Sequence, residues 1–113
     1  MGFSRAVRTG DRVVVAGTAP IWPDGAVDPD PGAQARRCLE IIAAALGEVG
    51  GSLGDVVRTR VYLSDRAHFS AVAEAHGAVF GSIRPANTTV VVALLDPAWK
   101  VEIEAEAMLL DTR

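Results

Sequence analysis

Three glutamates at alternate positions near the C-terminus, Glu102, Glu104 and Glu106, form the most concentrated group of ionisable side chains in the sequence. In a strand, residues two apart share one face, so these carboxylates would lie roughly 6.5–7 Å from one another. A carboxylate at the mouth of a cleft can orient and deprotonate a water molecule as a general base. A solvated or salt-bridged sheet face explains the same pattern. The spacing alone does not identify which glutamate has a chemical role.

The other candidate residues have simpler structural interpretations. Cys38, the only cysteine, lies on the apolar stripe of an expected helix, which favours a buried and unreactive thiol. His76 lies on the apolar face of a second expected helix, which favours a core or interface role over a catalytic one. His68 and His76 are eight residues apart, which is not a metal-ligand spacing, and no P-loop or G-x-G-x-x-G motif occurs. We therefore expect neither a metal nor a cofactor.

The overall composition limits the possible partners and the compartment. The 113 residues carry 11 Lys and Arg against 14 Asp and Glu, a net charge of −3 that argues against nucleic acid or an anionic membrane as a partner. A single cysteine excludes a disulfide framework, and no secretory signal or stretch of about 20 apolar residues occurs. These features predict a cytoplasmic protein. Because half of the residues in so short a chain are apolar, we also expect several copies to associate.

The elements that must position these residues are indicated by hydrophobic periodicity. Residues 5–9 and 12–18 carry β-branched side chains around Gly10-Asp11, which predicts a hairpin. A loop rich in Pro, Gly and Asp follows, and Asp28 or Asp30 can cap a helix that ends before Gly50. The buried stripe of that helix is expected to comprise Ala35, Cys38, Leu39, Ile42, Ala45, Leu46 and Val49.

The second half of the chain predicts a strand, a helix and two more strands. The first strand is expected over 56–63, with an inner face formed by Val57, Thr59, Val61 and Leu63. The helix follows Ser64 or Asp65, and its inner face is expected to comprise Phe69, Val72, Ala73, His76 and Phe80. The last strands are expected over 87–95 and 100–107. Together the elements predict one domain over 1–113, of α+β class, whose mainly antiparallel sheet carries two helices on one face.

Several short motifs in this order resemble the reactive-intermediate deaminase family (RidA/YjgF, also known as endoribonuclease L-PSP). They are Val-Val-Arg-Thr-Arg-Val-Tyr-Leu-Ser-Asp at 56–65, Arg-Pro-Ala at 84–86 and Lys-Val-Glu-Ile-Glu-Ala at 100–105. The likeness extends from about Arg5 to Leu109. It implies a chorismate-mutase-like fold and a homotrimer whose three sheets face inward as a barrel, with clefts at the subunit junctions. Active members of the family hydrolyse imines and enamines such as 2-aminoacrylate without a cofactor.

The resemblance carries only some of the family's site residues onto this chain. The glutamate that positions water matches Glu102, and a glycine of the second strand matches Gly17. The family's Pro-Ala-Arg triplet, whose arginine binds the substrate carboxylate, is Pro85-Ala86-Asn87 here, so Asn87 replaces a cation. A family tyrosine matches Phe3 and a family serine matches Ala16, so two hydroxyl groups are absent.

Two further residues are candidates for the same pocket. Trp22 is interpreted as a lid on the pocket or a contact with a neighbouring subunit, or else as a ring packed locally against Pro20 and Pro23. Arg84, three residues before Asn87, would restore a positive charge if its side chain entered the cleft.

The candidate residues are compatible with two functions. The first is cofactor-free hydrolysis (deamination) of a small imine or enamine in a cleft between subunits, where Glu102 activates water and Asn87 orients the substrate. The pocket is expected to bind a neutral or larger ligand, or to use Glu102 to hydrolyse a different imine or enamine, and the standard 2-aminoacrylate activity is expected to be lost. The alternative is a non-catalytic trimer, ligand-binding or chaperone-like, that retained the scaffold. Nuclease activity has little support in an acidic chain without a basic stripe.

Overall fold

Strands β1 (Ala6–Thr9) and β2 (Arg12–Thr18) form the predicted hairpin in the computed structural model, which describes residues 1–110. Thr9 pairs with Arg12, so the turn consists of Gly10 and Asp11. Gly10 has a φ of 61°, which a residue without Cβ adopts at no steric cost and which fits a type II′ turn. The residue types at the turn therefore account for its geometry.

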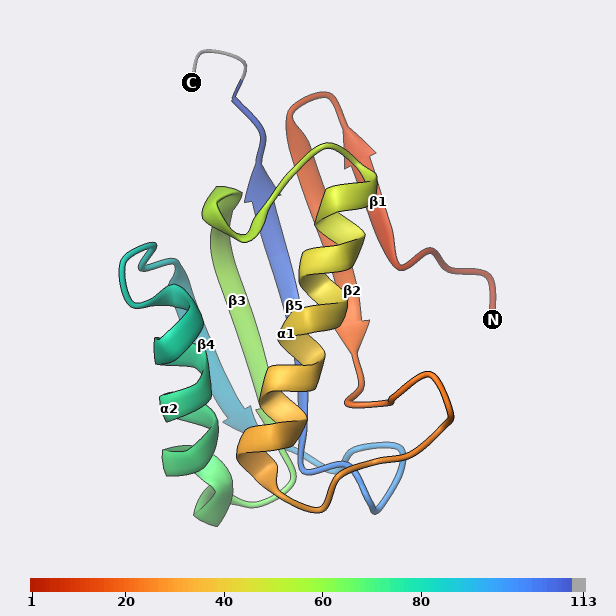
Figure 1. Ribbon diagram of the computed structural model, residues 1–113, viewed down its shortest axis with the longest axis vertical. Coiled ribbons are helices and arrows are strands. Elements are labelled where there is room, and N and C mark those ends of the chain that lie inside the picture. Colours follow the sequence, from red (N-terminus) through yellow and green to blue (C-terminus); the bar gives the residue numbers. More distant parts are fainter. Residues whose placement is uncertain (111–113) are drawn as a thin grey trace.

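The five strands of residues 1–110 belong to one sheet in the order β1-β2-β5-β3-β4 (Figure 1). Strand β5 (Val101–Met108) lies at its centre and runs antiparallel to both β2 and β3 (Val56–Leu63). Strand β4 (Ala86–Val91) is an edge strand and runs parallel to β3. A parallel pair needs a crossover connection, which is supplied here by a helix. The sheet is thus mainly antiparallel, as predicted, with one parallel pair.

Two helices among the described residues cover one face of this sheet (Figure 1). Helix α1 (Pro31–Glu48) begins where the Asp30 carboxylate accepts a hydrogen bond from the Ala33 N–H at 2.8 Å, and the chain turns away at Gly50, which has a φ of 90°. Helix α2 (Phe69–Phe80) connects β3 to β4. Short 3₁₀ helices precede β3 (η1, Leu53–Asp55) and α2 (η2, Arg66–His68).

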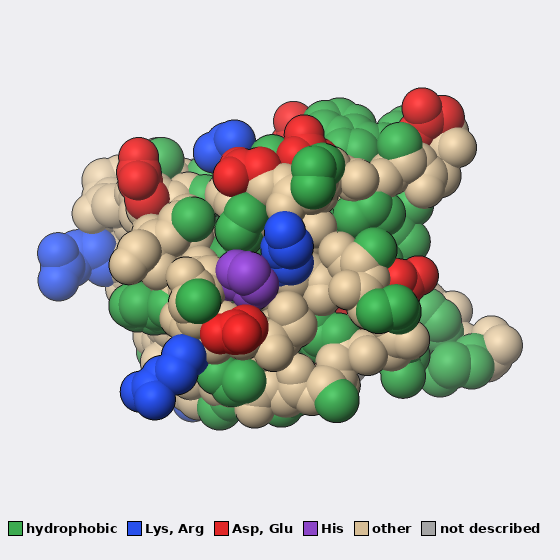
Figure 2. Space-filling model, turned by 90° about the horizontal axis from the view of Figure 1, so that it is seen from below, with side chains coloured by type: hydrophobic (Ala, Val, Ile, Leu, Met, Phe, Trp, Pro, Cys, Tyr) green, Lys and Arg blue, Asp and Glu red, His purple; other side chains and the backbone are tan. Residues whose placement is uncertain are grey.

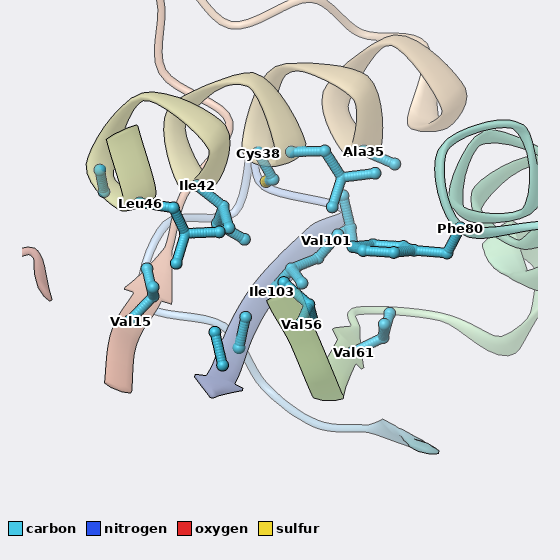
Figure 3. Close-up of a cluster of buried hydrophobic side chains, with 14 of the residues drawn as sticks. Val15, Ala35, Cys38, Ile42, Leu46, Val56, Val61, Phe80, Val101 and Ile103 are labelled. Carbon is cyan, nitrogen blue, oxygen red and sulfur yellow. The ribbon is translucent and has the colours of Figure 1, made fainter. Parts of the chain in front are cut away.

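The hydrophobic core lies between α1 and the covered face of the sheet. Cys38, Ile42 and Leu46 point from α1 toward side chains of the strands, and Phe80 points into the same cluster from α2 (Figure 3). Alternate residues of β5 are buried in this core, namely Val101, Ile103, Ala105 and Ala107. The intervening glutamates therefore lie on the face of the sheet that the helices leave uncovered.

The expected inner face of β3 is wrong at Val57, whose side chain is 49% exposed. Val56 pairs with Ala107 and Arg58 with Glu106, so two steps along β3 correspond to one step along β5. Val57 is therefore the extra residue of a β-bulge. The extra residue interrupts the alternation of side chains along β3, and Val56 is buried in the core in place of Val57. From Thr59 onward the predicted alternation holds.

Two other predicted details also differ from the structure. In α2, Phe69 and Ala73 are exposed, while Ala75 is buried with Val72 and Phe80, because the helix covers only the edge of the sheet and buries a narrow stripe. The strand expected over 87–95 ends at Val91, because β3, its partner among the described strands, ends at Leu63.

The two long loops, residues 19–30 and 92–100, lie at the lower end of the sheet in Figure 1, and this end has no surface of uniform charge. Figure 2 shows acidic and basic side chains scattered there among hydrophobic ones. Among residues 1–110, no helix combines the length and the apolar character that crossing a membrane requires.

Candidate functional site

Two of the three glutamates of β5 are engaged by neighbouring side chains. Glu106 pairs with Arg12 at 2.7 Å and with Arg58 and Arg60 at 3.8 Å. The hydrogen bond from Arg12 is the main reason why the pKa of Glu106 is lowered. Glu104 lies 3.8 Å from Arg60 and accepts a hydrogen bond from the Tyr62 hydroxyl.

The hydrogen bond to Glu104 raises the pKa of Tyr62, because the carboxylate favours the protonated phenol. Glu104 and Glu106 thus belong to a cross-strand network of salt bridges and hydrogen bonds. For these two residues the structure favours the salt-bridged sheet face over a chemical role.

Glu102 differs from the other two in having no such partner. Among the described residues, no Lys, Arg or His nitrogen lies within 4.0 Å of its carboxylate, and no side-chain hydrogen bond engages it. Its Oε1 lies over Gly17, where an added Cβ would be only 2.6 Å away. The carboxylate thus occupies space that only glycine leaves open.

The position of Gly17 follows from a bulge in β2. Val15 pairs with Ala105 and Thr18 with Ile103, so three steps along β2 correspond to two along β5. The extra residue bends β2 at Ala16 and Gly17, opposite the start of β5. Bulges of this kind re-aim side chains beside functional sites, and this one makes room for Glu102.

Glu102 and Gly17 line an open cavity of about 550 Å³ at this end of the sheet. Phe3 and Ala16, two of the residues expected in the pocket, also line it. The remaining lining consists of one cation, Arg5, together with Met1, Ala19, Ile21, Ile41, Leu95 and Trp99. The cavity is therefore mainly apolar and contains one carboxylate and one guanidinium.

Two loops that form this cavity are tied together by Gln34, a fully buried polar residue of α1. Its Nε2 donates to the carbonyl oxygens of Asp28 at 2.7 Å and Ala98 at 3.0 Å, and its Oε1 accepts from the Lys100 N–H at 2.7 Å. These three bonds fix the segment that carries Leu95 and Trp99 against the loop after β2.

Trp22 and Arg84 lie outside the lining of the Glu102 cavity. The Trp22 ring stacks on the guanidinium of Arg37, whose carbon is 4.7 Å from the ring centroid, and neighbouring Ile21 faces the cavity instead. Arg84 is exposed in the turn after α2, with a φ of 57°.

Asn87 occupies a second cavity of about 170 Å³ between β4 and α2, on the helix-covered side of the sheet. Its Nδ2 donates to Thr59 Oγ1 at 2.9 Å, and its Oδ1 accepts from the Thr89 hydroxyl at 2.8 Å. His76 Nε2 lies 2.9 Å from the same Thr59 oxygen, and burial lowers the pKa of His76. Within one chain, Asn87 and Glu102 are thus in separate cavities.

The remaining candidates have structural roles. Cys38 is fully buried, as predicted, and burial followed by the negative charge of Glu102 raises its pKa to about 12, which disfavours the reactive thiolate. Residues 50–54 match G-x-S-x-G, but Ser52 is exposed and forms a capping box with Asp55 rather than a nucleophile elbow. Within residues 1–110, no three His, Cys, Asp or Glu side chains are grouped closely enough to hold a metal ion.

Sequence reasoning missed Arg5, Trp99 and Gln34. Arg5 carries the single charged side chain among residues 1–7, and this isolated charge could have indicated a binding role. Gln34 lies four residues before Cys38 on the buried stripe of α1, where a lone amide indicates a structural hydrogen bond. Trp99 carried no signal, because only the fold brings its loop to the cavity.

Comparison with known proteins gives consistent results for sequence and fold. The sequence profile described as endoribonuclease L-PSP matches residues 1–109. A 2-iminobutanoate/2-iminopropanoate deaminase from Salmonella typhimurium is 36% identical over 110 residues, which cover 94% of this chain and 86% of that protein.

Two crystal structures extend this comparison. A Mycobacterium tuberculosis member of the YjgF/YER057c/UK114 family superposes with a TM-score of 0.88 at 47% identity, covering 96% of this chain and 87% of that one. TdcF from E. coli, crystallised with bound serine, gives a TM-score of 0.90 at 30% identity and covers 97% of this chain and 90% of that one.

Proposed function

The chain belongs to the endoribonuclease L-PSP (RidA/YjgF) family, and from this premise we propose that it hydrolyses a small imine or enamine in the Glu102 cavity. The relative from Salmonella typhimurium is a deaminase of 2-iminobutanoate and 2-iminopropanoate, so the proposed reaction is of the same type. The observation that carries the proposal is the state of Glu102. It is the glutamate of its row that lacks an ionic partner among the described residues, and it faces a cavity.

The proposed reaction needs only water and one general base. Glu102 takes a proton from a water molecule as the water oxygen adds to the imine carbon, giving a carbinolamine. That proton goes to the imine nitrogen and completes the carbinolamine. Glu102 then moves the proton of the new hydroxyl group to the same nitrogen, the C–N bond breaks as the carbonyl forms, and the products are a carbonyl compound and ammonia. An unpaired carboxylate suits this role, because a glutamate already bonded to arginine is a weaker base.

We propose that the working form is a cytoplasmic homotrimer with the cleft between subunits. Val7 and Val14, which pair across the β1–β2 hairpin, are 53% and 38% exposed on the uncovered sheet face. Leu95, at the rim of the cavity, is 91% exposed. Apolar side chains in such positions favour burial against another copy.

The edge strand β4 offers a second argument for a subunit junction at the site. Asn87 lies on this edge and is exposed, so a neighbouring copy can bring its own Asn87 to the Glu102 cavity. An amide supplies a hydrogen bond but no charge. Where the family has arginine, the loss of a charge-assisted contact weakens binding of a small carboxylate by roughly 2–4 kcal/mol, a factor of about 30 to 1,000. We therefore expect poor turnover of 2-aminoacrylate.

A non-catalytic ligand-binding or chaperone-like trimer is the second candidate function. The observation that favours it is the apolar lining, in which Phe3 and Ala16 stand where the family has hydroxyl groups. Such a chain would keep the cavity and bind ligand without releasing ammonia.

Ammonia release from a panel of freshly generated imines, measured above the spontaneous rate, separates the two functions. General-base catalysis contributes about 10²- to 10⁴-fold, so Glu102→Gln should lower kcat/KM at least 100-fold. Glu104→Gln is the matched control, because it changes the same strand face at a glutamate that Arg60 and Tyr62 already engage. Unchanged activity in Glu102→Gln would exclude the mechanism, and no activity on any imine would favour the binding function.

A further inference from the structure

We propose that Arg5 binds the carboxylate of the ligand in the Glu102 cavity, and that this ligand carries an apolar side chain. The inference names a ligand class for the cavity of the proposed function and rests on that function for the role of the cavity. It assigns to Arg5 the positive charge that Asn87 does not supply.

Arg5 is held in place at the cavity by two hydrogen bonds of its guanidinium. Nη1 donates to Thr18 Oγ1 at 2.9 Å, and Nη2 donates to the Gly17 carbonyl oxygen at 3.0 Å. The guanidinium carbon also lies 5.6 Å from the centroid of the Phe3 ring. A guanidinium has five N–H donors, so a group positioned in this way retains donors for a bidentate contact with a carboxylate.

The charge of Arg5 is not neutralised by the protein. Within residues 1–110, no carboxylate lies within 4.0 Å of it, whereas Arg12, Arg58 and Arg60 all pair with glutamates of β5. A half-buried guanidinium beside apolar walls attracts an anion more strongly than one in water, because the low dielectric constant reduces screening.

Gly17 connects the two charged groups of the cavity. Its carbonyl oxygen accepts from Arg5, and the space beside its Cα holds the carboxylate of Glu102. A ligand whose carboxylate binds Arg5 therefore has its next carbon close to Glu102. A nitrogen on that carbon, neutral or cationic, avoids the repulsion that a second anion would meet there.

The walls of the cavity favour an apolar side chain on the ligand. Ile21, Ile41, Leu95 and Trp99 contribute to the lining, and an apolar side chain on the ligand would bury more of these walls than the methyl group of a three-carbon acid does. The ligand class is thus a 2-imino acid, or a related monocarboxylate, with a branched aliphatic or aromatic side chain. Of the two ligands expected from the sequence, neutral or larger, this class corresponds to the larger one, and it carries a negative charge.

Binding of three probes tests the assignment without requiring turnover. The probes are 4-methyl-2-oxopentanoate, its uncharged amide, and pyruvate, measured by calorimetry on the full chain. Loss of a charge-assisted contact corresponds to about 10- to 100-fold in affinity. The natural protein should therefore bind the acid about 10- to 100-fold more tightly than the amide, and more tightly than pyruvate.

Variants of Arg5 separate recognition of the ligand from a structural role. Arg5→Gln should remove the preference for the acid and leave the affinity for the amide unchanged, whereas Arg5→Lys should keep part of the preference. Arg36→Gln, an exposed cation of α1 outside the cavity lining, is the control and should behave as the natural protein.

Three results would overturn the assignment: an acid preference that survives in Arg5→Gln, equal loss of acid and amide binding in that variant, or no binding of any probe to the natural protein. Equal loss would show that Arg5 only holds Thr18 and Gly17. Imine turnover with no preference for the acid would refute the role of Arg5 while leaving the proposed function intact. Acid-selective binding without imine turnover would support the role of Arg5 and refute the proposed hydrolysis.

Discussion

Replacement of Gly17 by alanine tests the role of Glu102 without removing the carboxylate. The added Cβ would lie 2.6 Å from Glu102 Oε1, and the carboxylate oxygen must move about 0.8 Å to regain an ordinary contact of 3.4 Å. Gly17 is not among the glycines with positive φ, so alanine fits its backbone. The variant should fold normally and differ from the natural protein mainly in the position of the Glu102 carboxylate.

The expected effect on catalysis follows from the size of this displacement. A misplacement of about 1 Å at a reacting group can cost about 100-fold, so kcat/KM for the best imine substrate should fall about 10- to 100-fold. This corresponds to roughly 1.4–2.7 kcal/mol of lost transition-state stabilisation. The free energy of unfolding should remain within about 0.5 kcal/mol of the natural value, because no buried contact is lost.

The assay is ammonia release from freshly generated imines, together with denaturant unfolding of each variant. Gly47→Ala is the control, because its added Cβ would meet no side chain or other segment within 4 Å beyond the local backbone of α1. Full activity in Gly17→Ala would refute the reasoning, since it would mean that the position of Glu102 is immaterial. A loss of activity accompanied by a large loss of stability would also contradict it.

Three further predictions concern the groups around the cavity. Gln34→Leu leaves three backbone groups without their bonds and should lower the free energy of unfolding by about 2–5 kcal/mol in denaturant titrations; a change under about 0.5 kcal/mol would show that water replaces the amide. Cys38, with a pKa of about 12, should resist iodoacetamide at pH 8 in the folded protein and react in denaturant, as read by intact mass; labelling at the same rate in both states would be incompatible with burial. Tyr62, the only tyrosine, should ionise above its ordinary pKa of 10.0 in an ultraviolet titration and return toward that value in Glu104→Gln. Because the pKa of Tyr62 is raised in the folded state, the contribution of this residue to stability is present below pH 10 and is lost as the pH rises through the folded pKa. Ionisation of Tyr62 at or below pH 10 would argue against the hydrogen bond to Glu104.

Local signals account for the parts of the fold that the sequence predicted correctly. The Gly10-Asp11 turn, the Asp30 cap and the alternation along β5 each depend on residues that are neighbours in the chain. The bulge at Val57 could not be predicted in this way, because it is defined only by the register between β3 and β5. The early end of β4 likewise depends on where its partner ends.

The candidate site was predictable to a similar extent. Resemblance to the family predicted Glu102 as the glutamate that positions water, and the structure supports this proposal because its two neighbours on β5 are already paired. The resemblance could not identify Arg5, because its place in the cavity depends on bonds to Thr18 and Gly17 that form only with the bulge in β2. Asn87 and Glu102 are not brought together within one chain, so their proposed cooperation depends on assembly.

A crystal structure of the protein with 4-methyl-2-oxopentanoate bound would test the central proposal most directly. The predicted result is a homotrimer in which the carbonyl carbon of the ligand lies within reach of a water held by Glu102, with the carboxylate on Arg5. An Asn87 from a neighbouring copy should face the same cleft. A ligand bound away from Glu102, or a Glu102 engaged by an arginine of another copy, would contradict the proposal.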